Sequence, residues 1–337
     1  MNRILEMLMI VLLLIGFGYP VRAQSNQFDL FSSDEPLLVR IDTDMKNLLK
    51  MTKEDEYQKA QLTIGDETIK IRIRPRGNNR LENCSFPPIT LNFKKAEFRD
   101  SSFNQLRKIK LVNACKLQLH YEQFLLREFL IYRSFNLLSE YSFKVRLLRL
   151  EYVDSRGKMK PVERFGFVIE DIKMLANRKT GMEIKALGLK DEVTNRDQMV
   201  LISLFQYMVG NTDWQVAALQ NLKLIKLLDF NEPAPYVIPY DFDYTGMVNA
   251  PYAIPSDNLA IDNITERLYW GQCYTETELE AVIKIFLARK EEIYTLYKNF
   301  SYLDKQSQVH SINYLDSFYK IIENKKSWKN TFMSKCD

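Results

Sequence analysis

The sequence predicts an α+β fold of two lobes, a β-rich lobe followed by a helical lobe. Two observations lead to this prediction. Up to residue 172, most segments alternate apolar with polar side chains, which is the repeat of a half-buried strand. From residue 173 onward, apolar residues recur at the spacing of amphipathic helices. Folds that separate strands and helices in this way belong to the α+β class, and a cleft between two lobes is the default ligand site.

The β-rich part contains a series of strands. The clearest pattern is a hairpin over residues 60–79, which turns at Gly65–Asp66. In its second arm, over residues 69–74, isoleucine alternates with lysine or arginine, so we expect one buried face and one cationic face. Further strands are expected over residues 37–42, 88–93, 106–113, 144–153 and 162–172.

Helices are expected where apolar residues recur three or four positions apart. One long helix, roughly from Leu117 to Ser139, interrupts the strands. In the second part, helices are expected over residues 195–211, 275–299 and 311–328. Two stretches between these helices, residues 210–225 and 237–249, have the pattern of short strands and loops.

The N-terminal residues have the composition of a secretory signal. Arg3 supplies a positive charge, an uncharged apolar run extends from Met7 to Phe17, and Ala23 provides a small residue for cleavage. This run is about half as long as a membrane-spanning helix, which needs roughly 20 residues. We therefore expect an exported protein, periplasmic or secreted, with no membrane span after cleavage. The expected organisation is a signal peptide over residues 1–23, a β-rich lobe over 24–172 and a helical lobe over 173–337.

Composition excludes several classes of protein. The net charge is only +4 and both signs are interspersed, which is unlike a nucleic-acid binder. The four cysteines are far apart and form no CxxC pair, which argues against a zinc site. Export permits disulfides, and four cysteines allow three pairings, among which the sequence does not choose. With only two histidines, a His-rich metal site is also excluded.

Four acidic or amide side chains stand at turning points in otherwise apolar stretches: Asp213, Asn221, Asp241 and Asp243. An unpaired buried carboxylate is strongly destabilising, so these groups are either satisfied by structural hydrogen bonds or converge on something positive. An Asp that accepts a hydroxyl proton, followed by an Asn and an Asp that ligate magnesium, is the set that phosphoryl transfer needs. The same order occurs in the catalytic and metal-binding loops of protein kinases.

The chain resembles the spore-coat protein H (CotH) kinase family, a group of exported, atypical kinase-like proteins. The resemblance rests on segments spread over most of the chain: "RPRGNN" (74–79), "PPITLNFKK" (87–95), "KIKLVNA" (108–114), "RFGFVIEDI" (164–172), "GNTDW" with the following "QN" (210–221) and "PYDFDYTG" (239–246). It implies a two-lobed, protein-kinase-like fold with ATP and magnesium (Mg2+) bound between the lobes.

The resemblance also implies roles for the acidic and amide residues. Asp213 matches the catalytic Asp, and Asn221 matches the downstream metal-binding Asn. Either Asp241 or Asp243 matches the metal-binding Asp, with Asp241 the better candidate. The chain departs from protein kinases here, because Asp213 and Asn221 are eight residues apart, three more than in the kinase pattern. In addition, residues 208–211 contain no His at the position that the kinase HRD motif requires.

Nucleotide contacts are implied for the β-rich lobe. Lys110 is the first candidate for the phosphate-binding lysine and Lys94 the second, while Arg76 suits bidentate phosphate contact. Glu128, or else Glu122, would pair with that lysine. The other expected contact is Glu170, at the junction of the lobes. The chain has no GxGxxG loop to cover the phosphates.

The expected function is therefore an exported, magnesium-dependent ATP phosphotransferase that acts on a protein or small hydroxyl acceptor. An alternative is a kinase-shaped binding or structural protein of the cell envelope without turnover, since the Gly-rich loop is missing. A third is a carbohydrate-binding protein, suggested by the Tyr and Trp side chains. The sequence does not identify the acceptor.

Overall fold

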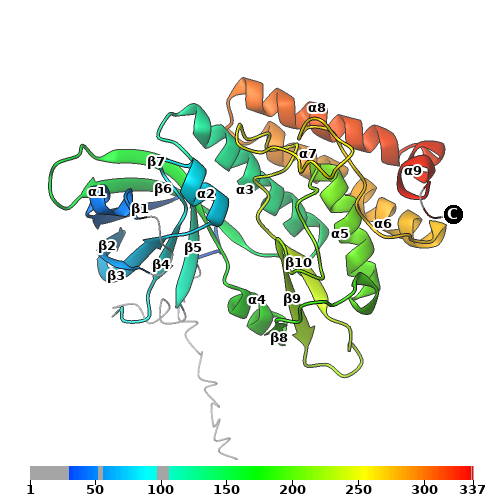
Figure 1. Cartoon of the computed structure of the whole chain (residues 1–337), viewed down its shortest axis with the longest axis horizontal. Coiled ribbons are helices and arrows are strands. Elements are labelled where there is room, and N and C mark those ends of the chain that lie inside the picture. Colours follow the sequence, from blue (N-terminus) through cyan, green and yellow to red (C-terminus); the bar gives the residue numbers. More distant parts are fainter. Residues whose placement is uncertain (1–29, 52–55, 97–105, 335, 337) are drawn as a thin grey trace, which may run out of the picture.

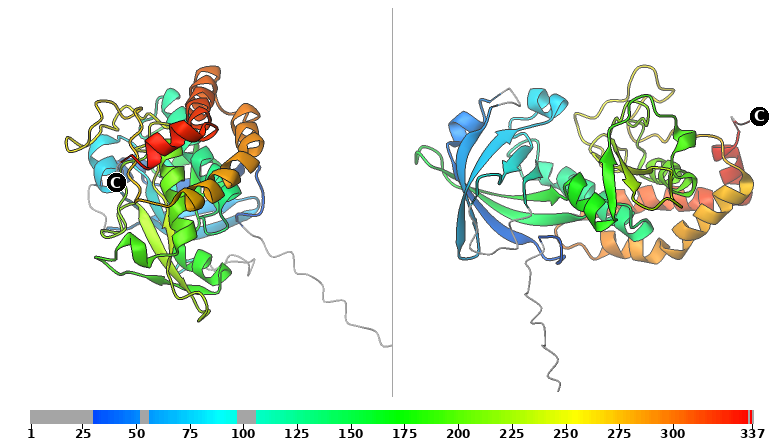
Figure 2. Two further views of the ribbon diagram at one scale, coloured as in Figure 1. Left: turned by 90° about the vertical axis from the view of Figure 1, so that its right-hand side faces the viewer. Right: turned by 90° about the horizontal axis from the view of Figure 1, so that it is seen from below.

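The computed structural model describes residues 30–51, 56–96, 106–334 and 336, so the predicted signal peptide lies outside the described residues. A β-barrel occupies one end of the molecule and a group of helices the other (Figure 1). A small three-stranded sheet lies beside the helices, and the view from below separates the barrel clearly from the helical end (Figure 2).

The barrel closes through the pairing of its first and sixth strands. Its strands are β1 (Leu37–Thr43), β2 (Gln58–Ile64), β3 (Glu67–Pro75), β4 (Ile89–Asn92), β5 (Lys108–Asn113), β6 (Val145–Asp154) and β7 (Val162–Ile169). They follow the order β1-β2-β3-β4-β5-β7-β6, and β6 returns to β1. That last pairing is parallel, with Leu37 beside Leu148, whereas the other neighbours are antiparallel.

The prediction of a two-lobed, protein-kinase-like fold is wrong. In the N-terminal part the described strands form a closed, mixed barrel, and the C-terminal part is a helical region. The alternating patterns indicate where strands form and which faces they bury, but they carry no information on which distant strands pair. Barrel closure depends on one such pairing, between residues 37–43 and 148–154. The predicted hairpin, by contrast, is confirmed as β2 and β3.

The wall formed by β5, β6 and β7 is buried on both faces. Inside the barrel, alternate residues of these strands, such as Leu111, Leu148 and Val168, join the barrel core. Their neighbours in sequence point outward: Val112 and Phe167 belong to a second core shared with the helices. Burial on both faces explains why each of these strands contains adjacent buried apolar residues, such as Leu111–Val112, Leu147–Leu148 and Phe167–Val168.

Helix α3 (His120–Leu138) is buried along most of its length and belongs to this second core, although it lies between barrel strands in the sequence. The long helix predicted there is confirmed. The other helices are α1 (Met45–Leu48), α2 (Asn78–Asn83), α4 (Ile172–Arg178), α5 (Arg196–Val209), α6 (Glu276–Ala288), α7 (Lys290–Lys298), α8 (Lys305–Ile322) and α9 (Lys325–Phe332). The helix expected over residues 275–299 is divided into α6 and α7. The helix expected over residues 311–328 is also divided, because α8 ends at Ile322 and a new helix, α9, begins after its N-cap Asn324.

The three-stranded sheet consists of β8 (Gly181–Ile184), β9 (Leu222–Leu227) and β10 (Tyr236–Pro239), in the order β10-β9-β8. Both of its pairings are antiparallel. Across the described residues, no helix is long and apolar enough to cross a membrane.

Two disulfides settle the cysteine pairing that the sequence left open. Cys84, directly after α2, is bonded to Cys115, just beyond β5. Cys273, before α6, is bonded to Cys336, after α9, so the last helix is tied back to the start of the C-terminal helical group.

We expect the Cys273–Cys336 bond to stabilise the fold. It closes a loop with a sequence separation of 63 residues, and removing such a crosslink raises the entropy of the unfolded chain. The double variant Cys273→Ser, Cys336→Ser should lose about 2–4 kcal/mol of unfolding free energy, measured by urea denaturation. An unchanged midpoint in this variant would contradict the assigned pairing.

Candidate functional site

The candidate site lies where the outer face of β5 emerges from beneath the helices. Along this strand the outward residues change from apolar to cationic: Ala114 and Val112 are buried in the helical core, whereas Lys110 is half-buried and Lys108 is exposed. Lys110 therefore stands at the margin between the barrel and the helical region. We call the polar group around it the junction site, which comprises Arg76, Lys110, Asp213, Asn221, Lys223 and Asp241.

Asp213 enters the junction site from the end of α5. Gly210 ends that helix in the left-handed conformation, with φ of 68°, and a Cβ there would meet the Tyr314 hydroxyl at 2.0 Å. Beyond this turn, the Asp213 amide donates to Asn211 Oδ1 at 2.9 Å. Its carboxylate accepts hydrogen bonds from Gln220 and Asn221. The carboxylate is thus held in one orientation by two amide side chains.

The acidity of Asp213 is reduced by its surroundings. Burial raises the pKa of this carboxyl, and the charge of Asp241 raises it further, against the hydrogen bonds from Gln220 and Asn221. A raised pKa suits a group that accepts a proton near neutral pH. The influence of Asp241 also shows that the two carboxylates lie near each other.

Asn221 connects Asp213 with the small sheet. Its Nδ2 donates to the Asp213 backbone oxygen at 2.7 Å and to the Asp213 carboxylate at 2.8 Å. Its own carbonyl accepts from the Tyr240 amide at 3.0 Å, which brings the residue before Asp241 alongside. Because the amide nitrogen is engaged by Asp213, the Oδ1 atom is the one that could ligate a cation.

Backbone strain is concentrated at the same place. Asn221 has φ of 51° and Asp241 has φ of 63°, and Leu219 is also left-handed at 51°. Residues other than glycine adopt this conformation rarely, and such residues cluster at functional sites. The Asp241 amide is fixed by the Tyr132 hydroxyl at 2.8 Å, so α3 positions this turn.

Lys110 is a strongly perturbed cation of the junction site. Burial lowers its pKa to about 7; Arg76 and Lys223 lower it as well, while Asp241 and Asp171 oppose the change. The Lys110 ammonium also lies 4.3 Å from the centre of the Tyr240 ring, and Lys223 lies 5.4 Å from the same ring. Lys110 and Lys223 therefore share the Tyr240 ring, next to Asp241.

A second polar cluster lies behind the junction site. Arg80, on α2, donates to Glu128 Oε2 at 2.7 Å and to Asp243 Oδ2 at 2.8 Å, and all three side chains are buried. Glu128 therefore pairs with Arg80 and not with Lys110. We call Arg80, Glu128 and Asp243 the Arg80 cluster. Since Asp243 is held there, Asp241 is the carboxylate that faces Lys110.

One guanidinium serves two carboxylates in the Arg80 cluster, and this affects their acidity. Burial raises the pKa of Glu128 to about 7, although the charge of Arg80 lowers it. Burial also raises the pKa of Asp243. Glu128 Oε1 is buried and has no hydrogen-bond partner among the described residues. Both acids therefore take up a proton more readily than exposed carboxyl groups, as expected for two buried acids that share a single cation.

Three other predicted contact residues lie elsewhere. Lys94 is exposed in the turn after β4, beyond Asn92, at the end of that strand that points away from Lys110. Glu122 accepts from the Phe165 amide at 3.0 Å. Glu170 is paired with Arg178 at 2.9 Å and accepts from the Lys144 amide, so it joins α4 to the barrel. None of the three forms a described contact with the residues of the junction site.

The oxygen atoms of the junction site determine whether a metal ion could bind there. Among residues 30–51, 56–96, 106–334 and 336, no three His, Cys, Asp or Glu side chains form a group that could hold an ion. The junction site offers the Asp241 and Asp213 carboxylates and the Asn221 amide oxygen. Magnesium is commonly held by one or two carboxylates together with substrate phosphates, so this set fits magnesium bound with a nucleotide better than a metal bound by protein alone.

Sequence reasoning missed Arg80, Lys223 and Gln220. Arg80 follows the quoted "RPRGNN" segment by one residue. A buried Glu in the apolar stripe of a long helix needs a cation, and this requirement is the signal that could have led to Arg80. Gln220 and Lys223 lie in the turn before β9 and near the start of that strand, respectively. No sequence pattern predicts the shape of this turn, which brings both residues to the site.

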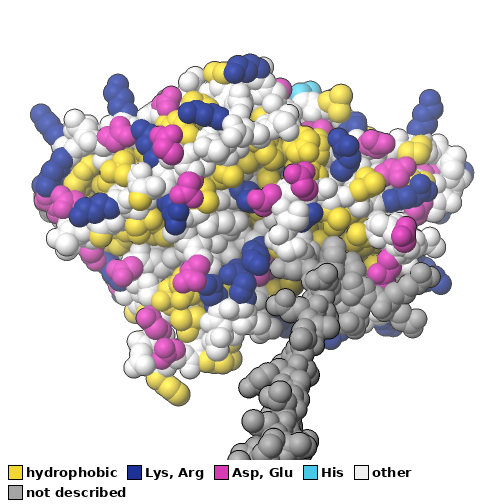
Figure 3. All heavy atoms as spheres, turned by 180° about the vertical axis from the view of Figure 1, so that it is seen from behind, with side chains coloured by type: hydrophobic (Ala, Val, Ile, Leu, Met, Phe, Trp, Pro, Cys, Tyr) yellow, Lys and Arg dark blue, Asp and Glu magenta, His cyan; other side chains and the backbone are white. Residues whose placement is uncertain are grey.

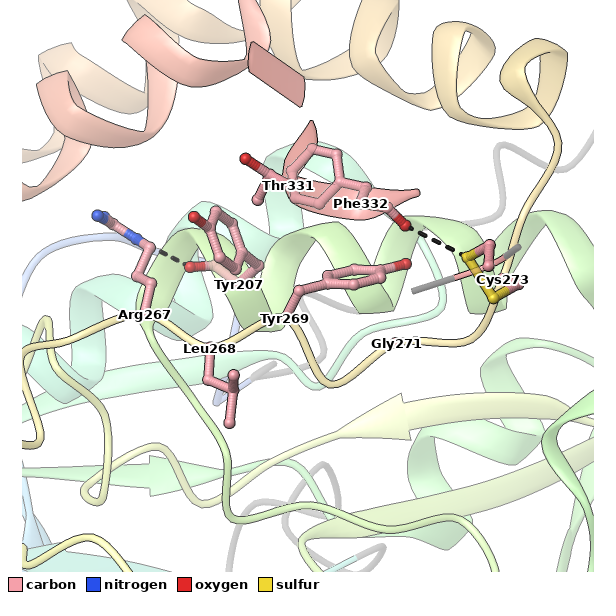
Figure 4. A pocket seen from close by; sticks show the side chains of 9 residues that line it. Tyr207, Arg267, Leu268, Tyr269, Gly271, Cys273, Thr331 and Phe332 are labelled. Carbon is pink, nitrogen blue, oxygen red and sulfur yellow. Dashed lines mark hydrogen bonds between the residues drawn. A yellow bond between two sulfur atoms is a disulfide. The ribbon is translucent and has the colours of Figure 1, made fainter. Parts of the chain in front are cut away.

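A cavity with a volume of about 200 Å³ lies elsewhere, between α5 and α9. Its wall contains the Tyr207, Tyr269 and Phe332 rings, with the Cys273 disulfide at one end (Figure 4). The guanidinium of Arg267 is already engaged by backbone oxygens of Tyr207, Met208 and Tyr314. No carboxylate or histidine is among the described lining residues.

Comparison with known proteins adds no assignment. No protein-family model matches the chain, and no curated protein matches it at a significant level. The resemblance to the CotH kinase family therefore stays a prediction.

The Arg80 cluster makes a testable contribution to stability. Replacing Arg80 by Met leaves two buried carboxylates without their cation, which should lower the unfolding free energy by about 3–5 kcal/mol at pH 8. At pH 5 the loss should be smaller, because the raised pKa values of Glu128 and Asp243 let these acids take up protons. Urea denaturation at both pH values measures this difference.

The control is Arg149→Met, at an exposed arginine of β6, which should change the unfolding free energy by less than about 0.5 kcal/mol. Equal effects of the two substitutions, or a loss from Arg80→Met that grows at pH 5, would contradict the described cluster.

Proposed function

We propose that the protein is an exported, magnesium-dependent phosphotransferase that moves the γ-phosphoryl group of ATP to a hydroxyl acceptor. The observation that carries this proposal is the junction site itself. There, an oriented Asp213 lies beside Asn221 and a strained Asp241, opposite the half-buried Lys110. Phosphoryl transfer depends mainly on positioning and on neutralising phosphate charge, and both kinds of group are present.

Asp213 is the proposed base. In the transfer step the acceptor oxygen bonds to the γ-phosphorus, the bond from that phosphorus to the bridging oxygen of ATP breaks, and ADP leaves. The acceptor proton passes to Asp213, whose orientation by Gln220 and Asn221 and whose raised pKa support this role.

The cations of the junction site would hold the phosphates. Lys110 and Lys223 come from the barrel and the small sheet, and Arg76 follows β3. Arg76 Nε is buried and has no hydrogen-bond partner among the described residues, which supports a role in binding an anion. These side chains would orient the γ-phosphate toward Asp213.

Asn221 and Asp241 are the proposed magnesium ligands. The Asn221 Oδ1 and the Asp241 carboxylate supply hard oxygen donors of the kind that magnesium prefers. Bound with the nucleotide, the ion would neutralise phosphate charge. The Arg80 cluster would keep Asp243 away from the ion and so fix which of the two aspartates faces it.

Export is supported by the two disulfides, because such bonds persist mainly in oxidising compartments. The proposed chemistry does not require the protein-kinase fold, since the same constellation of catalytic groups recurs on unrelated folds. What the CotH resemblance contributes to the proposal is the order Asp213, Asn221, Asp241, and not the architecture.

Removal of the junction carboxylates tests the proposal. In an assay of γ-phosphate transfer with ATP and magnesium, Asp213→Asn should lower the rate by about 10²- to 10⁴-fold, because it removes the base. Asp241→Asn should lose activity that is partly recovered at high magnesium. The control Asp257→Asn alters an exposed acid outside the site and should keep full activity.

Full activity of both Asp213→Asn and Asp241→Asn would overturn the assignment. Stabilisation of the wild type by ATP and magnesium in a thermal-shift assay, without transfer to any acceptor, would instead indicate a nucleotide-binding protein without turnover.

Nucleotide affinity should depend on pH through Lys110. Phosphate favours the protonated amine, so binding raises the pKa of Lys110 above its value of about 7 in the free protein. Affinity should be full below pH 7 and fall at higher pH by up to about tenfold per unit. Lys110→Arg stays charged and should remove this fall, as measured by calorimetric titration with ATP and magnesium. The same pH slope in both proteins would exclude Lys110 from the phosphate site.

A further inference from the structure

The outer face of the barrel next to the junction site carries a row of cations. On β3 the outward residues are Lys70, Arg72 and Arg74, and Arg76 continues the row, since its amide donates to Pro88 at 2.9 Å just as the β3–β4 ladder ends. Two strands away, β5 presents Lys108 and Lys110. We call these six residues the basic face.

The strand pairing fixes the spacing of the basic face. Arg74, Thr90 and Lys110 form one row across β3, β4 and β5. Arg72, Asn92 and Lys108 form the next row. Neighbouring strands are about 4.8 Å apart and alternate residues about 6.7 Å apart, so the cations form a grid of about 7 by 10 Å between backbone positions. The β4 residues between them are neutral and can form hydrogen bonds.

Tyr57 lies in the middle of this grid and organises it. The Arg74 guanidinium is 4.9 Å from the centre of the Tyr57 ring, and that of Arg72 is 5.3 Å away. The Lys108 ammonium is 6.0 Å from the same ring. Cations held over one ring lose less conformational freedom when a ligand binds.

Among the described residues, the basic face forms no salt bridge, although Asp241 and Asp171 lie near Lys110 at its end. Arg74 Nε and Arg76 Nε are buried without a hydrogen-bond partner among the same residues. The excess of positive charge is local to this face, because the net charge of the chain is only +4. Figure 3, which views the molecule from behind relative to Figure 1, shows basic and acidic side chains interspersed.

From this arrangement we infer that the basic face binds an acidic peptide segment, and that the acceptor of the proposed phosphotransferase is a protein with acidic residues near the accepting hydroxyl. The inference rests on the proposed function for the acceptor role only. In an extended peptide, alternate side chains are also about 6.7 Å apart, which matches the repeat of the β3 row. A peptide along this row would run toward Arg76 and reach the junction site.

The direction of the row supports this placement. From Lys70 to Arg76 the row spans about 20 Å, the length of six residues of extended chain. It ends beside Lys110, which lies near Asp241, and Asp241 in turn lies near Asp213. An acceptor Ser, Thr or Tyr placed several residues beyond the acidic stretch would thus come to Asp213.

The test is binding of a labelled peptide to the mature protein by fluorescence anisotropy. The probe is a peptide of about ten residues in which Glu alternates with Ser, long enough to cover the β3 row. Neutral and Lys-containing peptides of equal length, inorganic polyphosphate and a single-stranded oligonucleotide serve as comparisons. The acidic peptide should bind most tightly, and its affinity should fall with added salt.

The variant Arg72→Gln, Lys108→Gln removes two cations that the phosphate site does not use. An exposed charge pair contributes a factor of roughly 1.5 to 5 in affinity, so this variant should bind the acidic peptide about 2- to 25-fold more weakly. The control Lys284→Gln, Lys320→Gln makes the same charge change at exposed positions of α6 and α8 and should bind normally.

Three results would overturn the inference: no preference for the acidic over the neutral peptide, equal losses in the two variants, or tighter binding of polyphosphate or the oligonucleotide than of the peptide. The binding measurement requires no turnover. Peptide binding without phosphoryl transfer would therefore contradict the proposed function alone, whereas transfer to acceptors without an acidic preference would contradict this inference alone.

Discussion

One buried cation, Arg80, fixes the relative position of three segments on which the candidate site depends. It joins α2 to α3 through Glu128 and to the turn after β10 through Asp243. Breaking such a shared pair leaves a buried charge, so α2 and the turn are not free to move independently. Asp241 lies two residues before Asp243 and is held from the other side by the Tyr132 hydroxyl of α3. The strained backbone at Asp241 is possible because these contacts determine it from both sides.

The second constraint is the shared wall of the barrel. Because β5 packs against the helical core at Val112 and Ala114, its cationic residues begin where that cover ends. Lys110 is therefore buried enough to lose much of its charge near pH 7, yet it borders acids that come from the helical region. A site assembled from both parts requires that the barrel and the helices keep a fixed relative position. The shared wall of β5, β6 and β7 fixes that position, because its two faces belong to the barrel core and to the helical core. The basic face continues outward from this point along β3 and β5.

Local features were predictable from sequence and long-range ones were not. The alternation of isoleucine with Lys or Arg over residues 69–74 gives both the buried and the cationic face of β3, because a strand repeats every two residues. Apolar spacing gives α3. Barrel closure by β1 and β6 depends on contacts more than a hundred residues apart, and the expected kinase-like architecture was wrong for that reason. In the site, the order Asp213, Asn221, Asp241 in the sequence pointed to residues that lie together. The role of Arg80, and the pairing of Glu128 with Arg80 instead of Lys110, could be found only from the tertiary structure.

The central claim is that phosphates and a divalent cation meet in the junction site. A crystal structure of the mature protein with a non-hydrolysable ATP analogue and manganese, collected for anomalous scattering, tests it most directly. The account predicts an anomalous peak between Asn221 and Asp241, with the γ-phosphate within hydrogen-bond distance of Lys110 or Arg76. Nucleotide bound only in the aromatic cavity beside Tyr207 and Phe332, or metal bound away from Asn221 and Asp241, would contradict it.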